Sequence, residues 1–69
     1  MTDFIGENLK ALRQQAGLTT RDVANYLDVG HAIVAKWEKS KANITDERLE
    51  ELAKYYGVTI EDLEFGVIR

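Results

Sequence analysis

The apolar residues of this chain recur with the spacing of α-helices, and no stretch alternates between apolar and polar residues as a half-buried strand does. The first helix shows this pattern in its apolar positions, which are Ile5, Leu9, Leu12 and Ala16. They share one helix face, and Gly17 directly after them is expected to end the helix. The same pattern predicts five helices, over about residues 5–16, 20–27, 31–39, 46–56 and 60–65.

Threonine residues stand where a cap is needed before three of the predicted helices. Thr19 is followed three residues later by Asp22, and Thr59 is followed in the same way by Asp62. In this arrangement, the capping box, the side chain of each residue accepts a hydrogen bond from the backbone N–H of the other. Thr45 is expected to cap the fourth helix, because two acidic residues that favour a helix N-terminus follow it.

A turn of three residues, 28–30, separates the second and third predicted helices. Asp28 tolerates left-handed backbone geometry and a glycine ends the segment, so the chain is expected to turn sharply here. Ala24 is small enough to lie where two crossing helices come closest, and Val34 and Trp37 are spaced to pack beneath them. Trp37 could instead stack on nucleic-acid bases, but its spacing favours the core. The sequence therefore predicts a helix-turn-helix followed by a polar loop.

The length of 69 residues allows a single domain, expected to span residues 1–69 with its core over about residues 4–66. The chain has no cysteine, so packing and helix caps must stabilise it in place of disulfides. It contains neither an apolar run of roughly 20 residues that could span a bilayer nor the features of a signal peptide. These features favour a cytoplasmic protein.

The net charge is −3, and the charge is unevenly distributed. Residues 1–45 carry six Lys and Arg against five Asp and Glu (+1), whereas residues 46–69 carry three against seven (−4). A positive patch can therefore exist outside the acidic C-terminal third. No metal or other cofactor is expected, since His31 is the single histidine and no cysteine accompanies it. No pairing of a nucleophile with a base, and no phosphate-binding glycine loop, indicates an enzyme.

The order of small, apolar and turn residues from Thr20 to Trp37 is typical of a helix-turn-helix. Over essentially residues 5–66 the chain resembles the Cro and repressor family of XRE-like regulators, on this order and on four further elements: Glu38, Lys41, residues 43–45 and residues 52–58. The resemblance implies an all-α fold, a compact five-helix bundle of the lambda-repressor-like type. It also implies a sequence-specific transcriptional regulator of the phage, plasmid or bacterial repressor type, whose third helix enters the major groove of double-stranded DNA.

The resemblance further implies which residues meet DNA, on the second and third helices and the loop after them: Thr20, Arg21, His31, Ala32, Ala35, Lys36, Lys39, Lys41 and Asn43. The four at positions 31, 32, 35 and 36 would face base edges, with Ile33 at the margin. Thr20 would contact a phosphate at the start of its helix, and the residues at 39, 41 and 43 would contact the flanking backbone. Arg13 and Glu38 match a family ion pair between the first and third helices, and are assigned to structure.

The chain departs from the family pattern at three positions, which hold Thr20 for a frequent glutamine, Asp28 for the turn glycine and Gly30 for a Ser or Thr cap. The third helix also presents three residues without hydrogen-bonding side chains: Ala32, Ile33 and Ala35. Such residues can contact the methyl group of thymine, so this helix is compatible with an A·T-rich site recognised by shape and apolar contact. Direct readout then depends on His31 and Lys36.

Alternatives remain at three points. The fold could serve protein–protein interaction, as an antitoxin-like or regulator-binding module with weak or no DNA binding. The lysines at positions 36, 39 and 41 could form only a solvated surface, although phosphate contact is preferred. Val67 and Ile68 are apolar where a tail is normally polar, which indicates either a homodimer contact or a strand or linker cut off from a longer protein, with a further C-terminal domain or a protein partner as the alternative to a homodimer.

Overall fold

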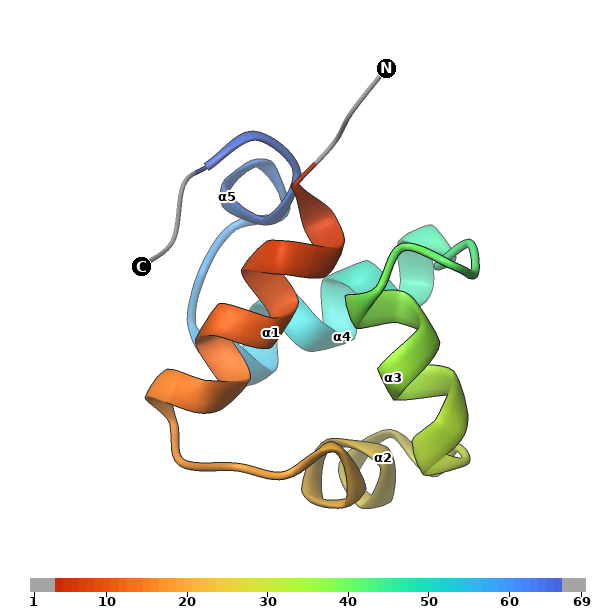
Figure 1. The fold of residues 1–69 in the computed structure, drawn as a ribbon. Coiled ribbons are helices and arrows are strands. Elements are labelled where there is room, and N and C mark those ends of the chain that lie inside the picture. Colours follow the sequence, from red (N-terminus) through yellow and green to blue (C-terminus); the bar gives the residue numbers. More distant parts are fainter. Residues whose placement is uncertain (1–3, 67–69) are drawn as a thin grey trace.

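The computed structural model describes residues 4–66 and is built from α-helices alone within that range. The helices are α1 (Ile5–Gln15), α2 (Thr20–Leu27), α3 (His31–Glu38), α4 (Asp46–Tyr56) and α5 (Ile60–Phe65) (Figure 1). Each begins at the residue predicted from the sequence and ends within one residue of the predicted end. The predicted all-α, five-helix fold is confirmed.

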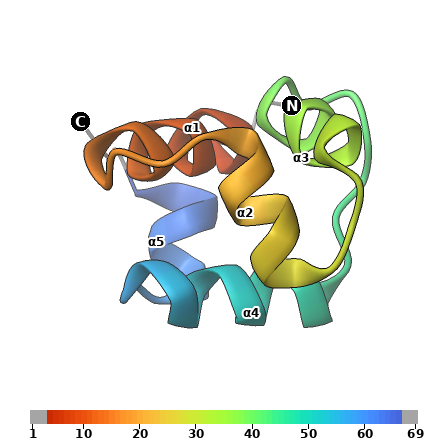
Figure 2. The same ribbon diagram turned by 90° about the horizontal axis from the view of Figure 1, so that it is seen from below.

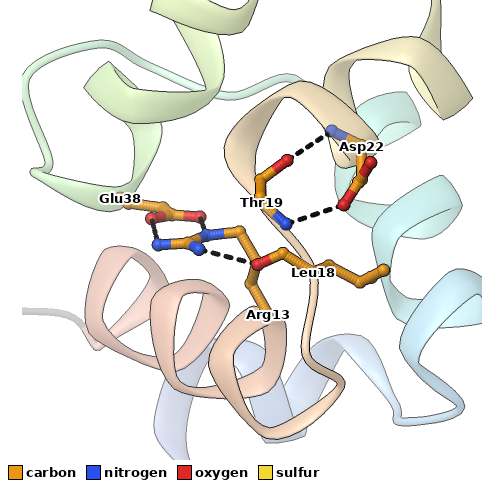
Figure 3. Close-up of polar contacts among 5 residues, drawn as sticks. All are labelled: Arg13, Leu18, Thr19, Asp22 and Glu38. Carbon is orange, nitrogen blue, oxygen red and sulfur yellow. Dashed lines mark hydrogen bonds and ion pairs between the residues drawn. The ribbon is translucent and has the colours of Figure 1, made fainter.

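The threonine caps form as predicted. Thr19 Oγ1 accepts the backbone N–H of Asp22 at 3.1 Å, and Asp22 Oδ2 accepts the N–H of Thr19 at 2.9 Å (Figure 3). Thr59 and Asp62 form the same pair of bonds at 3.0 and 3.2 Å. Thr45 Oγ1 accepts the N–H of Arg48 at 3.2 Å. These bonds satisfy N–H groups that the first turn of a helix otherwise leaves without a partner, and so fix where α2, α4 and α5 begin.

Four helices are followed, directly or after one cap residue, by a residue with a left-handed backbone. These residues are Gly17 (φ 72°) after α1, Asp28 (φ 59°) after α2, Ser40 (φ 58°) after α3 and Gly57 (φ 73°) after α4. In each case the next residue donates its N–H to a carbonyl five residues back, as Val29 does to Ala24 at 3.0 Å. This closure turns the chain abruptly and explains why the connections are so short. The sharp turn predicted at Asp28 is confirmed.

Every helix contributes to one apolar core, whose buried members are Leu9, Val23, Ala24, Leu27, Val34, Trp37, Leu49, Leu52, Ala53 and Leu63. Trp37 is only 6% exposed, as its spacing predicted, and so serves packing and not base stacking. Of the two apolar residues of α5 after its first turn, Leu63 is fully buried but Phe65 is 72% exposed. Residues two apart in a helix point to different sides, so a helix that packs one face on the core buries only one of the two.

The N-terminal half of α1 holds α5 on one side and α3 on the other (Figure 1). The buried amide of Asn8 donates to the carbonyl oxygens of Leu63 at 2.9 Å and Gly66 at 2.7 Å, at the end of α5. At Gly6 a Cβ atom would lie 2.8 Å from the carbonyl oxygens of Trp37 and Glu38. Glycine at position 6 therefore lets α1 contact the backbone at the end of α3 directly.

Candidate nucleic-acid interface

Helix α3 has one face in the core and one face open. Val34, Trp37 and Glu38 are buried against α1 and α2, whereas His31, Ala32 and Lys36 are exposed. In both views of the ribbon α3 lies at the edge of the molecule, and no other described helix covers its outer side (Figures 1 and 2). We call the outward side of α3 and its C-terminal cap the α3 outer face; it consists of the exposed His31, Ala32, Lys36 and Lys39 and the half-buried Ala35.

The spacing of these five residues explains why they share a face. Ala32, Lys36 and Lys39 follow at intervals of four and three, so they project from the same side of the helix, with Ala35 half-buried at the margin. Ile33 is half-buried too and packs against the core. The structure therefore brings together the residues that the sequence analysis assigned to base contact.

The loop after α3 continues this surface. Lys39 follows the last residue of α3, and Lys41 is held beside the helix because its N–H donates to the carbonyl oxygen of Lys36 at 2.8 Å. Ser40 between them has a left-handed backbone (φ 58°). Lys41 and Asn43 are exposed. The cations at positions 36, 39 and 41 form no ion pair within residues 4–66, so their charge is available to a ligand.

Thr20 and Arg21 lie on a different helix, in the first turn of α2. Arg21 is exposed, and the hydroxyl-bearing Thr20 is half-buried. They are the first two residues of α2, so their N–H groups precede the first intrahelical bonds. An anion could be bound there by these N–H groups, because the N-terminus of a helix carries a partial positive charge.

Arg13 links α1 to both ends of the α2–α3 pair (Figure 3). Its Nε and Nη2 donate to the two carboxylate oxygens of Glu38 at 2.7 and 3.1 Å. Its Nη1 donates to the carbonyl oxygen of Leu18, just before α2, at 2.9 Å. The ion pair expected from the family resemblance is thus present, with side chains only 14% and 6% exposed. Its role is structural, because it fixes the start of α2 against the end of α3.

Tyr56 lies close enough to this ion pair for Glu38 to affect the pKa of its hydroxyl. Burial raises the pKa of the Tyr56 hydroxyl, and the nearby carboxylate of Glu38 raises it further. The hydrogen bond with Glu38 also raises the pKa of Arg13, against the opposing effect of burial. At neutral pH Tyr56 is therefore an uncharged neighbour that does not compete with Glu38 for the guanidinium.

Two polar residues of structural importance were missed by the sequence analysis. Asn8 was overlooked although it lies between Ile5 and Leu9, where a helix with an apolar inner face has no reason to place an amide. Arg48, at the start of α4, donates to the carbonyl oxygen of Leu27 at the end of α2 at 3.2 Å. The feature of the sequence that could have drawn attention to Arg48 is an arginine in the first turn of a helix, where acidic residues are favoured.

Other kinds of site were searched for among residues 4–66. This part of the chain has no group of three His, Asp or Glu side chains that could hold a metal ion. None of its helices is both long and apolar enough to cross a membrane.

A five-helix bundle that exposes the second helix of a helix-turn-helix is the architecture of the helix-turn-helix proteins. Comparison of this chain with known proteins identifies the family within that class. Residues 9–63 match the helix-turn-helix family model, and the chain belongs to this family of Cro/C1-type, XRE-like proteins. It is 36% identical over 61 residues to the HTH-type transcriptional regulator DdrOP3 of Deinococcus deserti. The aligned residues cover 88% of this chain and 47% of that protein. The chain thus spans about half the length of this curated relative.

Two solved structures show the same fold. A transcriptional regulator from Listeria innocua superposes with a TM-score of 0.87 at 28% identity, over 100% of this chain and 64% of that one. The DNA-binding domain of BldD superposes with a TM-score of 0.75 at 32% identity, over 88% of this chain and 89% of that one.

Proposed function

We propose that this chain is a sequence-specific DNA-binding domain of a cytoplasmic transcriptional regulator, and that α3 enters the major groove. The observation that carries the proposal is the α3 outer face, which no other described helix covers and which continues into the lysines of the following loop, none of them in an ion pair within residues 4–66. The similarity to DNA-binding domains of regulators supports it.

The interface divides into two roles. Lys39, Lys41 and Asn43, together with the start of α2 at Thr20 and Arg21, would contact phosphates and set the position of the domain without reading sequence. Residues at the N-terminal part of α3 would meet base edges. His31 and Lys36 can form hydrogen bonds there, and Lys36 suits the acceptors of a guanine. The small alanines at positions 32 and 35 allow close approach and contact with thymine methyl groups.

A binding experiment tests both roles. Selection from a randomised duplex pool would give the preferred site, and fluorescence anisotropy at several salt concentrations would give its affinity. Lys41→Ala should weaken binding to all duplexes and lower the salt slope by about one unit. Lys36→Ala should relax the preference at one base position, at a cost of about 1–3 kcal/mol. Lys54→Ala on α4 is the matched control with little expected effect, and absence of salt-dependent binding to any duplex would refute the proposal.

The contact with thymine methyl groups has its own test. Replacing a thymine of the selected site by uracil removes the methyl group without changing the base pair. Each contacted methyl should be worth about 0.8 kcal/mol, which is about fourfold in affinity. Equal affinity for thymine and uracil duplexes at every position would leave DNA binding intact and exclude methyl contact by Ala32 and Ala35.

We also propose that the regulator acts as a homodimer on two half-sites. The supporting feature is an apolar end of the molecule, where Phe65 is 72% and Phe4 39% exposed and the Phe4 N–H donates to the carbonyl oxygen of Glu64 at 3.4 Å. Val67 and Ile68, which suggested self-association, lie outside the described residues. A dimer requires half-sites separated by about one helical turn. Sedimentation of the protein with and without DNA tests this, and Phe65→Lys should weaken self-association.

A protein partner is the second candidate function. It is favoured by the exposed aromatic ring of Tyr26, which is 55% exposed and stacks on Tyr55 with ring centroids 4.1 Å apart. NMR titration with duplex DNA separates the two candidates. Shifts centred on residues 30–43 support DNA binding, whereas no shift at low salt would favour a protein partner.

A further inference from the structure

Arg48 occupies a place where a helix N-terminus favours the opposite charge. It is the third residue of α4, and its backbone N–H is bonded to the capping Thr45. In α2 and α5 the same position holds an aspartate, Asp22 or Asp62, whose carboxylate completes the capping box and faces the positive end of the helix. An arginine provides neither benefit. Within α4 its side chain gains the exposed i,i+3 ion pair with Glu51, which contributes little to stability, so the energetics of α4 give little reason for an arginine at this position.

The side chain of Arg48 extends toward α2 instead. Its Nη1 donates to the carbonyl oxygen of Leu27 at 3.2 Å and to Oε1 of Glu51 at 2.9 Å. Leu27 is the last residue of α2, so its carbonyl is one of those that a helix leaves without an intrahelical partner. Arg48 thus bonds the chain at the point where it leaves α2.

The direction of α3 is set within three residues of that point. Asp28 turns the chain with its left-handed backbone, and α3 begins at His31. With so short a connection, a rotation of the Leu27 peptide would change the direction of α3. A second contact between α2 and α4 lies one residue earlier, where the rings of Tyr26 and Tyr55 stack at an interplanar angle of 24°. Figure 2 shows the end of α2, from which the turn leads to α3, lying against α4, where both of these contacts are made.

We propose that Arg48 is a positioning residue for DNA recognition: its bond to the Leu27 carbonyl fixes the turn at residues 28–30 and thereby the angle at which α3 is presented to DNA. This inference rests on the proposed function. Arg48 itself does not contact DNA in this account. A local arrangement that costs helix stability while serving another element is typical of functional positions.

The test uses Arg48→Gln, because glutamine is neutral and can complete a capping box with Thr45. The melting temperature should be unchanged or slightly higher. Amide hydrogen exchange at residues 28–31 should be faster than in the parent, and affinity for the selected site should fall about tenfold. Lys54→Gln is the matched control, since it removes one charge from α4, and should keep affinity within about twofold.

Two further measurements separate positioning from other roles. Arg48→Lys should recover most of the affinity, because a lysine side chain can still donate to the Leu27 carbonyl. The salt slope of Arg48→Gln should equal that of the parent, whereas loss of a phosphate contact would lower it by about one unit. The proposal is overturned by a lower slope, by unchanged exchange at residues 28–31, or by a melting temperature that falls together with affinity. If the parent binds no duplex, the proposed function fails, while hydrogen exchange still tests the effect of Arg48 on the turn.

Discussion

Two arginines hold the α2–α3 pair against the rest of the molecule, and they differ in their surroundings. Arg13 binds the outer ends of the pair, with Leu18 before α2 and Glu38 at the end of α3, and its ion pair is 14% and 6% exposed. Arg48 binds the middle of the pair, at the Leu27 carbonyl, and its ion pair with Glu51 is 35% and 49% exposed.

Because the ion pair of Arg13 is buried and that of Arg48 is exposed, we expect Arg13 to affect mainly the stability of the fold and Arg48 mainly the direction of α3. Removing one partner of a buried ion pair leaves a charge without compensation and costs several kcal/mol, whereas an exposed pair contributes at most about 1 kcal/mol. Arg13 should therefore control whether the α2–α3 pair stays folded on α1. Arg48 should affect mainly the direction of α3. The following predictions test this division, from the largest expected effect to the smallest.

Arg13→Ala should lower the free energy of unfolding by about 3–5 kcal/mol, because Glu38 would remain buried without its cation. For a domain of 69 residues this is a large part of the total stability of about 5–15 kcal/mol. Chemical denaturation followed by circular dichroism measures it. Replacing both partners, as Arg13→Met with Glu38→Leu, should recover much of the loss. A loss below about 1 kcal/mol in the single variant would show that the pair behaves as an exposed one.

Asn8→Ala should lower the free energy of unfolding by about 1–3 kcal/mol. Asn8 resembles Arg48 in bonding the end of another helix, but it is only 3% exposed, so the carbonyls of Leu63 and Gly66 would lose a buried donor. Gln14→Ala, at an exposed position of the same helix, is the control and should change stability by less than about 0.5 kcal/mol. Equal stabilities of the two variants would contradict the importance of burial in this comparison.

Alkaline pH should destabilise the Arg13 end of the molecule through Tyr56. The pKa of Tyr56 is raised in the folded state, so the unfolded chain loses this proton first as pH rises. The stabilisation of the folded state by protonated Tyr56 is complete below a pH of about 10, the ordinary pKa of tyrosine, and is lost as the pH rises above that value. Denaturation between neutral pH and pH 11 should show this loss in the parent and a smaller one in Tyr56→Phe. Identical pH profiles would argue against the raised pKa.

The sequence predicted what depends on neighbouring residues. Helix bounds, the threonine caps and the turn at Asp28 each follow from residues at most five apart, and all three are confirmed. The exposure of the predicted interface residues also follows from helix periodicity, although their contact with DNA stays a prediction. Family resemblance, and not spacing, indicated the pair of Arg13 and Glu38, whose members lie 25 residues apart in the chain.

What was missed depends on contacts between distant segments. Asn8 bonds α5 across 55 residues at Leu63, and Arg48 bonds Leu27 across 21 residues. No local pattern indicates such partners; only the misfit of each residue with its own helix could have done so. Gly6 is a third case, since its importance comes from the closeness of the end of α3 and not from its own backbone. Phe65 shows the reverse, because it lies on a different side of α5 from the buried Leu63 and is exposed although its residue type alone would place it inside.

Asp28→Gly should raise the free energy of unfolding by about 0.5 kcal/mol, which is the smallest effect predicted here. Asp28 is exposed and has φ 59°, a conformation that glycine adopts without the steric cost of a Cβ atom. The greater freedom of glycine in the unfolded chain offsets part of the gain. Asp28→Ala is the matched control: it removes the same carboxylate but keeps a Cβ atom, so it should be less stable than the parent. Thermal denaturation of the three proteins measures the difference.

If the glycine variant is more stable but shows faster amide exchange at residues 28–31, the turn depends on backbone stiffness as well as on Arg48. If the glycine and alanine variants are equally stable, a Cβ atom in the left-handed geometry at position 28 carries no measurable cost.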